Sequence, residues 1–282
     1  MGSGFRNHRL FDTARSDAAL AGGEEPVYAR NQQAPGIIRY LWRTTVMLTC
    51  LAEILLGFVL TRLRHAGGLT PRHRALWLQQ SCALIVRRLG MRVEYKGPLP
   101  ESGLVVSNHL SYLDILFYAT ITPCVFVSKS DVRSWPLFGL FARCAGTIFI
   151  TRERTSAVGQ AARQITEALH EKIPVLLFPE GTSTDGGTVL PFHSSLFEPA
   201  LQAHAAITAA AIGYSIDGGR ERDLCYYGDI TFGPHLVRVL GMGELRAGIQ
   251  FGTERNASSD RKTAARELHG EVTAMRALIK DR

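Results

Sequence analysis

The sequence lacks the cysteine patterns that build disulfide frameworks or zinc sites. Its 282 residues include five cysteines, and no two of them form a C-x-x-C pair. An odd number of widely spaced cysteines argues against structural disulfides and favours a reducing compartment. The chain also lacks the G-x-S-x-G motif of serine hydrolases, a metal-ligand cluster and an internal repeat. We therefore expect no metal, no cofactor and no serine nucleophile of that type.

Charge is sparse and unevenly distributed along the chain. Charged residues make up 20% of the sequence and hydrophobic residues 46%, which is enough for one large folded domain with an accessory segment. Between Ile37 and Pro100 there are ten cations and two anions, a net charge of +8, so the rest of the chain is nearly neutral. A basic segment that is also apolar favours an anionic membrane surface over nucleic acid. The alternative is a solvated basic face on a core helix.

Two apolar helical segments occupy the basic region. Ile37–Leu63 is the most apolar stretch of the chain, with one charge, Glu53, at its centre. A membrane-spanning helix needs about 20 apolar residues, and a charge in mid-bilayer is costly, so a helix lying in or dipping into one leaflet fits better than a full span. Ala75–Leu89 is expected to be a second helix that starts near Thr70-Pro71. Residues 37–90 are therefore predicted to form a membrane-associating helical hairpin.

From residue 91 to the end, short apolar runs alternate with helical patterns. This alternation predicts an α/β domain over residues 91–282, with a mixed, largely covered β-sheet and flanking helices. Residues 1–36 show no sustained period and no signal-peptide pattern, and they are predicted to be a disordered tail. The expected strands are Arg92–Tyr95, Leu104–Ser107, Val125–Ser128, Thr147–Thr151, Val175–Phe178, Ile207–Gly213, Cys225–Thr231 and Leu245–Phe251. The expected helices are Tyr112–Thr120, Pro136–Cys144, Ser156–Glu171, Leu196–Ala203 and Arg261–Ile279.

The first candidate for chemistry is a histidine five residues before an aspartate, between an expected strand and an expected helix. Within one regular helix, His109 and Asp114 would point about 140° apart. They can meet if His109 lies in the turn and Asp114 in the first helical turn. The carboxylate could then orient the imidazole as a general base. The alternative is that Ser111-x-x-Asp114 is a helix-capping pattern and His109 an ordinary turn residue.

Two further strand ends carry candidate binding residues. Phe178-Pro179-Glu180-Gly181-Thr182 closes one expected strand, and Arg152 closes another. Ligands bind at strand ends in α/β sheets, and arginine suits phosphate or carboxylate recognition. The alternatives are a plain strand-ending turn and a surface ion pair.

Taken together and in this order, these blocks resemble the PlsC-type glycerolipid acyltransferase family, which includes 1-acyl-sn-glycerol-3-phosphate acyltransferases. The family's blocks read N-H-x-x-x-x-D, G-x-x-F-I-x-R and F-P-E-G-T, and the resemblance covers roughly residues 90–255. The matching residues are Asn108, His109, Asp114, Gly146, Phe149, Ile150, Arg152 and Phe178 to Thr182. The resemblance implies His109 as general base and Asp114 as the residue that orients it. It implies substrate binding by Asn108, Lys129, Arg152, Glu180, Gly181, Thr182 and Ser183.

One departure leaves the head group of the acceptor open. Ser183 stands where many lysophosphatidate enzymes of this family have an arginine. The resemblance implies that an acyl thioester acylates the free hydroxyl of a lysolipid, as in phospholipid biosynthesis. The first expectation is 1-acylglycerol-3-phosphate, which would give phosphatidic acid. Lyso-ornithine lipid or another lysophospholipid is the alternative acceptor, and a non-catalytic lipid-binding membrane protein is the alternative of a different class.

The same resemblance implies the partners and the location. The expected partners are a membrane bilayer, a lysolipid acceptor and a thioester donor, and no nucleic acid is expected. The donor would be acyl-CoA or an acyl group on acyl carrier protein, used as a co-substrate. The expected location is the cytoplasmic face of the inner or plasma membrane.

Overall fold

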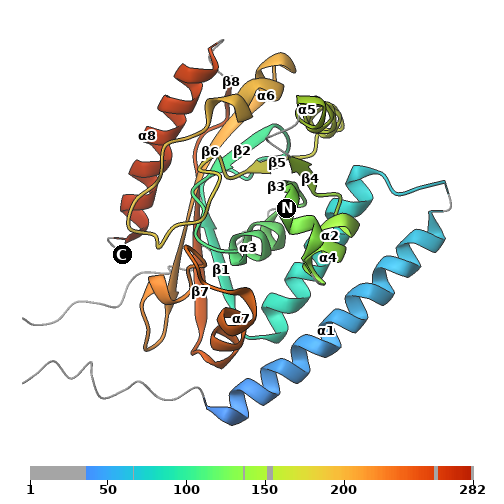
Figure 1. Ribbon diagram of the computed structural model, residues 1–282, viewed down its shortest axis with the longest axis vertical. Helices are drawn as coiled ribbons and strands as arrows, with labels where there is room; N and C mark the ends of the chain where they lie inside the picture. Colours follow the sequence, from blue (N-terminus) through green and yellow to red (C-terminus); the bar gives the residue numbers. More distant parts are fainter. Residues whose placement is uncertain (1–35, 66, 136, 151–154, 257–259, 281–282) are drawn as a thin grey trace, which may run out of the picture.

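The computed structural model describes residues 36–65, 67–135, 137–150, 155–256 and 260–280. A helical hairpin, α1 (Ile37–Arg64) and α2 (Pro71–Arg88), precedes an α/β domain (Figure 1). In chain order the domain contains β1 (Arg92–Lys96), β2 (Leu104–Ser107), α3 (Leu113–Ile121), β3 (Val125–Lys129), the 3₁₀-helix η2 (Ser130–Ser134), α4 (Phe138–Cys144), β4 (Ile148–Ile150), α5 (Thr155–His170), β5 (Val175–Leu177), η3 (Ser194–Phe197), α6 (Glu198–Gln202), β6 (Ala206–Ile216), η4 (Glu221–Asp223), α7 (Phe232–Gly241), β7 (Leu245–Phe251), β8 (Arg255–Asn256) and α8 (Arg261–Lys280).

The strands form one mixed sheet, as predicted. The order is β1-β7-β6-β2-β5-β3-β4, and β8 pairs with β6. The pairs of β6 with β7 and β8 are antiparallel, and the other pairs are parallel. One hydrophobic cluster joins the sheet to α2, α3 and α7, and a second joins its other face to α5, α6 and α8. Helices therefore cover both faces, which fits the continuous apolar runs of the central strands.

The structure corrects one expected strand and adds a helix. Residues 225–231 were expected to form a strand, but they form a loop that leads into α7. The loop turns at Gly228, whose φ is +58°, and its Tyr226 N–H donates to the Leu110 carbonyl across the site rather than to a strand. In α7, Leu236, Val239 and Leu240 follow helical spacing and pack on the core.

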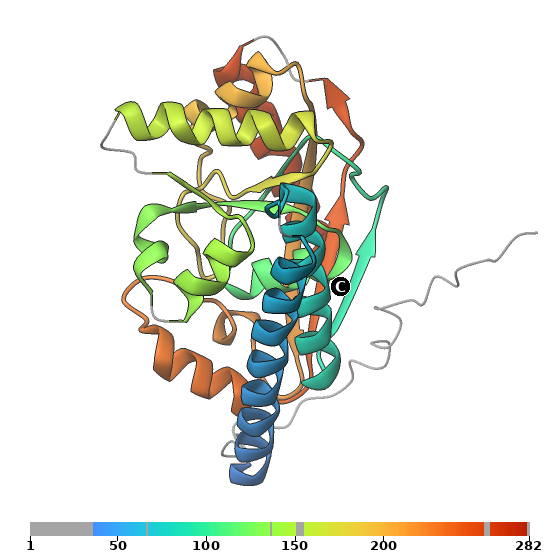
Figure 2. The same cartoon turned by 90° about the vertical axis from the view of Figure 1, so that its right-hand side faces the viewer.

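The hairpin is present and packs on the domain. The Trp77 indole on α2 donates to the Ile54 carbonyl on α1 at 3.2 Å, and Glu53 forms an ion pair with Arg88 at 2.7 Å. The charge at the centre of α1 is therefore paired. In Figure 2, α1 lies across the front of the molecule.

The outer side of α1 is apolar and exposed. Exposed large hydrophobic residues on it are Ile37, Ile38, Leu41, Trp42, Leu48, Leu56, Val59, Leu60 and Leu63. Within the described chain, α1 is the helix long and apolar enough to cross a membrane. A row of uncovered apolar side chains on one helix is typical of a membrane-associating surface. The predicted tail lies outside the described residues except for Gly36.

Candidate active site

The site forms where three parallel strands end side by side. β2, β5 and β3 are neighbours in the sheet, so their carboxyl ends meet at one edge. His109 follows β2, Phe178 to Ser183 follow β5, and Lys129 ends β3. The predicted convergence of the motifs at strand ends is therefore what the fold produces.

His109 and Asp114 are in direct contact. His109 lies in the turn after β2 and Asp114 in the first turn of α3, so the bend between them overcomes their unfavourable helical spacing. The His109 Nδ1 atom lies 2.6 Å from Asp114 Oδ2. The imidazole also stacks on the Phe178 ring, with centroids 4.2 Å apart and planes 15° apart. The contact with Asp114 leaves Nε2 as the nitrogen available to a substrate proton.

Asp114 is fully buried and receives several donors. Its Oδ2 accepts from the Leu110 N–H at 2.8 Å and the Ser111 N–H at 3.2 Å as well as from His109. Its Oδ1 accepts from the Tyr214 hydroxyl. One of the two hydrogen bonds of a capping box is therefore present, because the Asp114 carboxylate accepts from the Ser111 amide. The same carboxylate also contacts the His109 imidazole. The two contacts are compatible, since the Ser111 amide helps to fix the carboxylate that contacts the imidazole.

Glu180 holds the backbone of the turn that contains His109. Its Oε1 accepts from the His109 N–H and its Oε2 from the Leu190 N–H, both at 2.7 Å, and the side chain is buried. Burial raises the pKa of this carboxyl, while the amide donors of Leu190 and His109 oppose the rise. Both carboxylate oxygens therefore bind the protein itself. The expectation that Glu180 touches substrate remains a prediction.

Asn108 also binds backbone. Its side-chain amide donates to the Ile212 carbonyl at 3.1 Å, and its Oδ1 accepts from the Ile212 N–H at 2.9 Å. The side chain thus continues the β2–β6 ladder beyond the last strand residue, Ser107. Substrate contact by Asn108 likewise remains a prediction.

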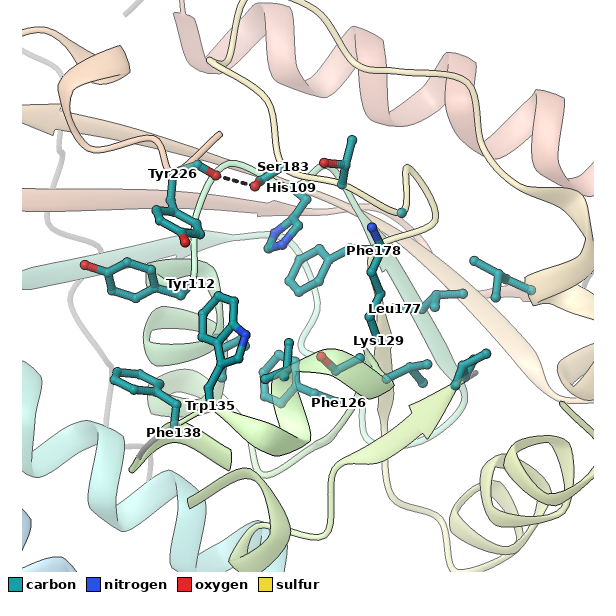
Figure 3. Close-up of a pocket in the computed structure, with 18 residues that line it drawn as sticks. His109, Tyr112, Phe126, Lys129, Trp135, Phe138, Leu177, Phe178, Ser183 and Tyr226 are labelled. Carbon is teal, nitrogen blue, oxygen red and sulfur yellow. Dashed lines mark hydrogen bonds between the residues drawn. The ribbon is translucent and has the colours of Figure 1, made fainter. Parts of the chain in front are cut away.

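A cavity of about 270 Å³ opens beside His109 (Figure 3). Lys129, Gly181, Thr182 and Ser183 line it together with His109, so four of the predicted binding residues share one cavity with the predicted base. Gly181 adopts a φ of +70°, a left-handed conformation that glycine tolerates better than other residues. The Ser183 hydroxyl donates to the Tyr226 carbonyl. Arg152, the remaining predicted binding residue, lies outside the described residues.

An aromatic wall on the cavity was not anticipated. Tyr112, Trp135, Phe138 and Tyr226 line the side opposite Lys129 in Figure 3. The Tyr112 hydroxyl bonds the buried ring of His235 at 3.0 Å, and burial raises the pKa of Tyr112. No local motif marks these residues, because they come from the turn before α3, the residue after η2, the start of α4 and the loop before α7. Because this loop was expected to be a strand, the sequence did not indicate that Tyr226 lines the cavity.

A second cavity lies beneath the hairpin. Its volume is about 190 Å³, and residues of α1, α2, α3, α4 and α7 line it. Nearly all of its lining is apolar. It shares six residues with the cavity beside His109, namely Tyr112, Ile115, Phe126, Ser128, Val132 and Phe138. The cavity beside His109 therefore adjoins apolar space that lies beneath α1 and α2.

The site contains the parts of an enzyme that transfers a group to a hydroxyl. A buried carboxylate orients a histidine, a lysine and backbone groups surround the same cavity, and apolar space lies alongside. Among the described residues, no group of three histidine, cysteine, aspartate or glutamate side chains could hold a metal ion.

Comparison with known proteins defines the family. The profile described as Acyltransferase matches residues 91–213. The chain is 36% identical over 222 residues to a lyso-ornithine lipid O-acyltransferase of Rhizobium meliloti (strain 1021), covering 73% of this chain and 74% of that protein. It is 30% identical over 241 residues to a 1-acyl-sn-glycerol-3-phosphate acyltransferase of Neisseria gonorrhoeae, covering 84% and 92%. The chain therefore belongs to the PlsC-type Acyltransferase family, and it is an acyltransferase.

A solved structure supports the fold. The 1-acyl-sn-glycerophosphate (LPA) acyltransferase PlsC from Thermotoga maritima superposes with a TM-score of 0.64 at 15% identity, covering 87% of this chain and 96% of that one. The match includes most of the chain, so the α/β architecture with its flanking helices is that of a known acyltransferase structure.

Proposed function

We propose that this protein transfers an acyl group from a thioester to the free hydroxyl of a membrane lysolipid. The observation that carries the proposal is the His109–Asp114 pair, with His109 lining a cavity that shares residues with the apolar cavity beneath the hairpin. A lipid acceptor must reach the base from a bilayer, and the exposed apolar side of α1 provides the contact with that bilayer.

The proposed step is direct transfer. His109 Nε2 takes the proton of the lysolipid hydroxyl while its oxygen bonds the thioester carbonyl carbon. The C–S bond then breaks, and the thiolate leaves with the proton that the imidazolium returns. Asp114 holds the reactive tautomer and stabilises the imidazolium in between. Lys129, which lines the same cavity, has the charge to bind an anionic part of either substrate.

The donor is proposed to be acyl-CoA or acyl carrier protein, without a further cofactor or metal. The apolar cavity beneath the hairpin has the chemistry to hold an acyl chain next to the base. The hairpin's cationic segment would place the enzyme on the anionic cytoplasmic leaflet.

Two acceptors are supported by different observations. Ser183 in place of an arginine, together with the 36% identity to a lyso-ornithine lipid O-acyltransferase, favours lyso-ornithine lipid. The match over 84% of the chain to a 1-acyl-sn-glycerol-3-phosphate acyltransferase, together with Lys129 in the cavity, supports 1-acylglycerol-3-phosphate. We place lyso-ornithine lipid first, because Ser183 stands where many lysophosphatidate enzymes of this family have an arginine that could bind the phosphate.

A panel of acceptors with one acyl-CoA tests the proposal. Lyso-ornithine lipid, 1-acylglycerol-3-phosphate and zwitterionic lysophospholipids are presented in mixed micelles, and products are identified by mass spectrometry. We expect an ester product with lyso-ornithine lipid at the highest kcat/KM. Hydrolysis of the thioester with no acylated lipid from any acceptor would refute the function.

A further inference from the structure

Tyr214 follows Asp114 by 100 residues and is not among the residues that line the cavity beside His109. β2 ends at Ser107, which pairs with Ala210, whereas β6 continues to Ile216. The part of β6 that extends beyond Ala210 therefore runs beside the turn between β2 and α3. Ala210, Ile212 and Tyr214 share one face of the strand and pack in the same cluster as α3.

The Tyr214 hydroxyl is the donor that reaches Asp114 Oδ1. Among the described residues, the other donors to this carboxylate all converge on Oδ2. Burial, and then the Asp114 charge, raise the pKa of the Tyr214 phenol well above its usual range, so the phenol keeps its proton and donates. Donors at both oxygens restrict the rotation of a carboxylate more than donors at one oxygen alone, because fully satisfied buried networks are rigid.

The backbone of Tyr214 is itself fixed. Its N–H donates to Glu221 Oε1 at 2.8 Å, and Glu221 forms an ion pair with the buried Arg276 of α8. The same stretch is bonded two residues earlier, where Asn108 binds both backbone groups of Ile212. The Tyr214 side chain therefore extends from a part of β6 whose backbone is held by these hydrogen bonds.

We infer that Tyr214 is a positioning residue, which acts on the reaction through Asp114 by fixing the rotation of its carboxylate and sharing its negative charge. The effect of Tyr214 on the reaction rests on the proposed function. The coupling from Tyr214 through Asp114 to His109 is a property of the protein without substrate. It extends the histidine–aspartate pair to a chain of three residues, with Tyr214 contributed by a distant strand.

Removing the phenol has a defined electrostatic consequence. Without the hydrogen bond from the Tyr214 hydroxyl, the Asp114 carboxylate attracts the His109 imidazolium more strongly. His109 then releases its proton at a higher pH. Other titratable groups near Asp114 are Tyr118 and Cys225, and burial raises the pKa of both, so neither adds a charge. Glu180, in the turn after β5, accepts from the His109 and Leu190 N–H groups, and Tyr214→Phe removes neither bond.

The test is a titration of His109 by NMR on the full-length protein, without substrate, with ¹³C-labelled histidine assigned from a His109→Gln spectrum. For Tyr214→Phe we expect the midpoint to rise by about half a pH unit. Site-specific 3,5-difluorotyrosine at position 214 keeps the ring and the donor but makes the phenol more acidic, so the midpoint should fall. If Tyr214→Phe does not fold, the protein with 3,5-difluorotyrosine at position 214 tests the coupling to His109 instead.

Tyr118→Phe is the matched control. Tyr118 is fully buried in the same cluster, but its hydroxyl bonds Ser107 Oγ at 2.7 Å rather than Asp114. Its removal should leave the midpoint in place. An unmoved midpoint in both Tyr214 proteins, or an equal shift in Tyr118→Phe, would overturn the inference.

Kinetics supply the catalytic part of the test. With an accepted lysolipid, Tyr214→Phe should lower kcat about tenfold and leave both KM values within about twofold. Unchanged kcat with a shifted midpoint would limit Tyr214 to electrostatic coupling and overturn its positioning role. If no lysolipid is accepted by the wild type, the proposed function fails, while the NMR result still decides the coupling.

Discussion

Replacing Asp114 with asparagine removes the buried charge but preserves most of the hydrogen bonds. The asparagine carbonyl can take the place of Oδ2 and accept from His109, Leu110 and Ser111. The amide nitrogen then faces the Tyr214 hydroxyl, which can rotate to accept from it. The fold should survive, with the free energy of unfolding lowered by no more than about 2 kcal/mol.

Catalysis should suffer far more than stability. In the proposed transition state the imidazole gains a proton, and in Asp114→Asn no carboxylate stabilises that charge. The loss expected for a neutralised orienting carboxylate is about 10³–10⁴-fold in kcat. Because Asp114 is fully buried and is not among the residues that line the cavity, KM should change little.

The assay follows the thiol released from the acyl thioester, together with thermal unfolding of the same preparation. A variant that is folded and has a kcat within about tenfold of the wild type would refute the proposed role of Asp114. Asp131→Asn, on η2, is the control for removing a carboxylate outside the pair.

Three other substitutions test separate parts of the account. Glu180→Gln offers one acceptor to the amides of His109 and Leu190, so kcat should fall about 10–100-fold, measured by thiol release. Ser183→Arg should favour the phosphate-bearing acceptor, raising the catalytic efficiency with lysophosphatidate relative to lyso-ornithine lipid about tenfold, and an equal change with Ser183→Leu would contradict this. Leu41→Ser with Trp42→Ser should weaken binding to anionic vesicles at least about tenfold in a pelleting assay, whereas Leu278→Ser, exposed to a similar degree on α8, should not.

Local sequence signals predicted the elements that meet at the site. The end of β2, the start of α3 and the turn after β5 each follow a short pattern of apolar residues and turn formers, so their positions could be inferred from neighbouring residues alone. The meeting of His109 and Asp114 followed from the bend between strand and helix.

Contacts that depend on the tertiary fold could not be predicted in this way. Tyr214 reaches Asp114 only because β6 extends beyond β2 and pairs antiparallel with β7. The loop around Tyr226 has strand-like composition, but its N–H donates to Leu110 and its carbonyl accepts from Ser183. Glu180 was expected to face a ligand, and its sequence gives no sign that two backbone amides occupy both of its oxygens.

His109 is proposed as the base that deprotonates a lysolipid hydroxyl. The most direct measurement is the rate of acylated-lipid formation by His109→Ala, followed by mass spectrometry with lyso-ornithine lipid and acyl-CoA. We expect the rate to fall by at least about 10²–10⁴-fold while the variant remains folded and bound to vesicles. Formation of the acylated lipid at the wild-type rate would contradict the account.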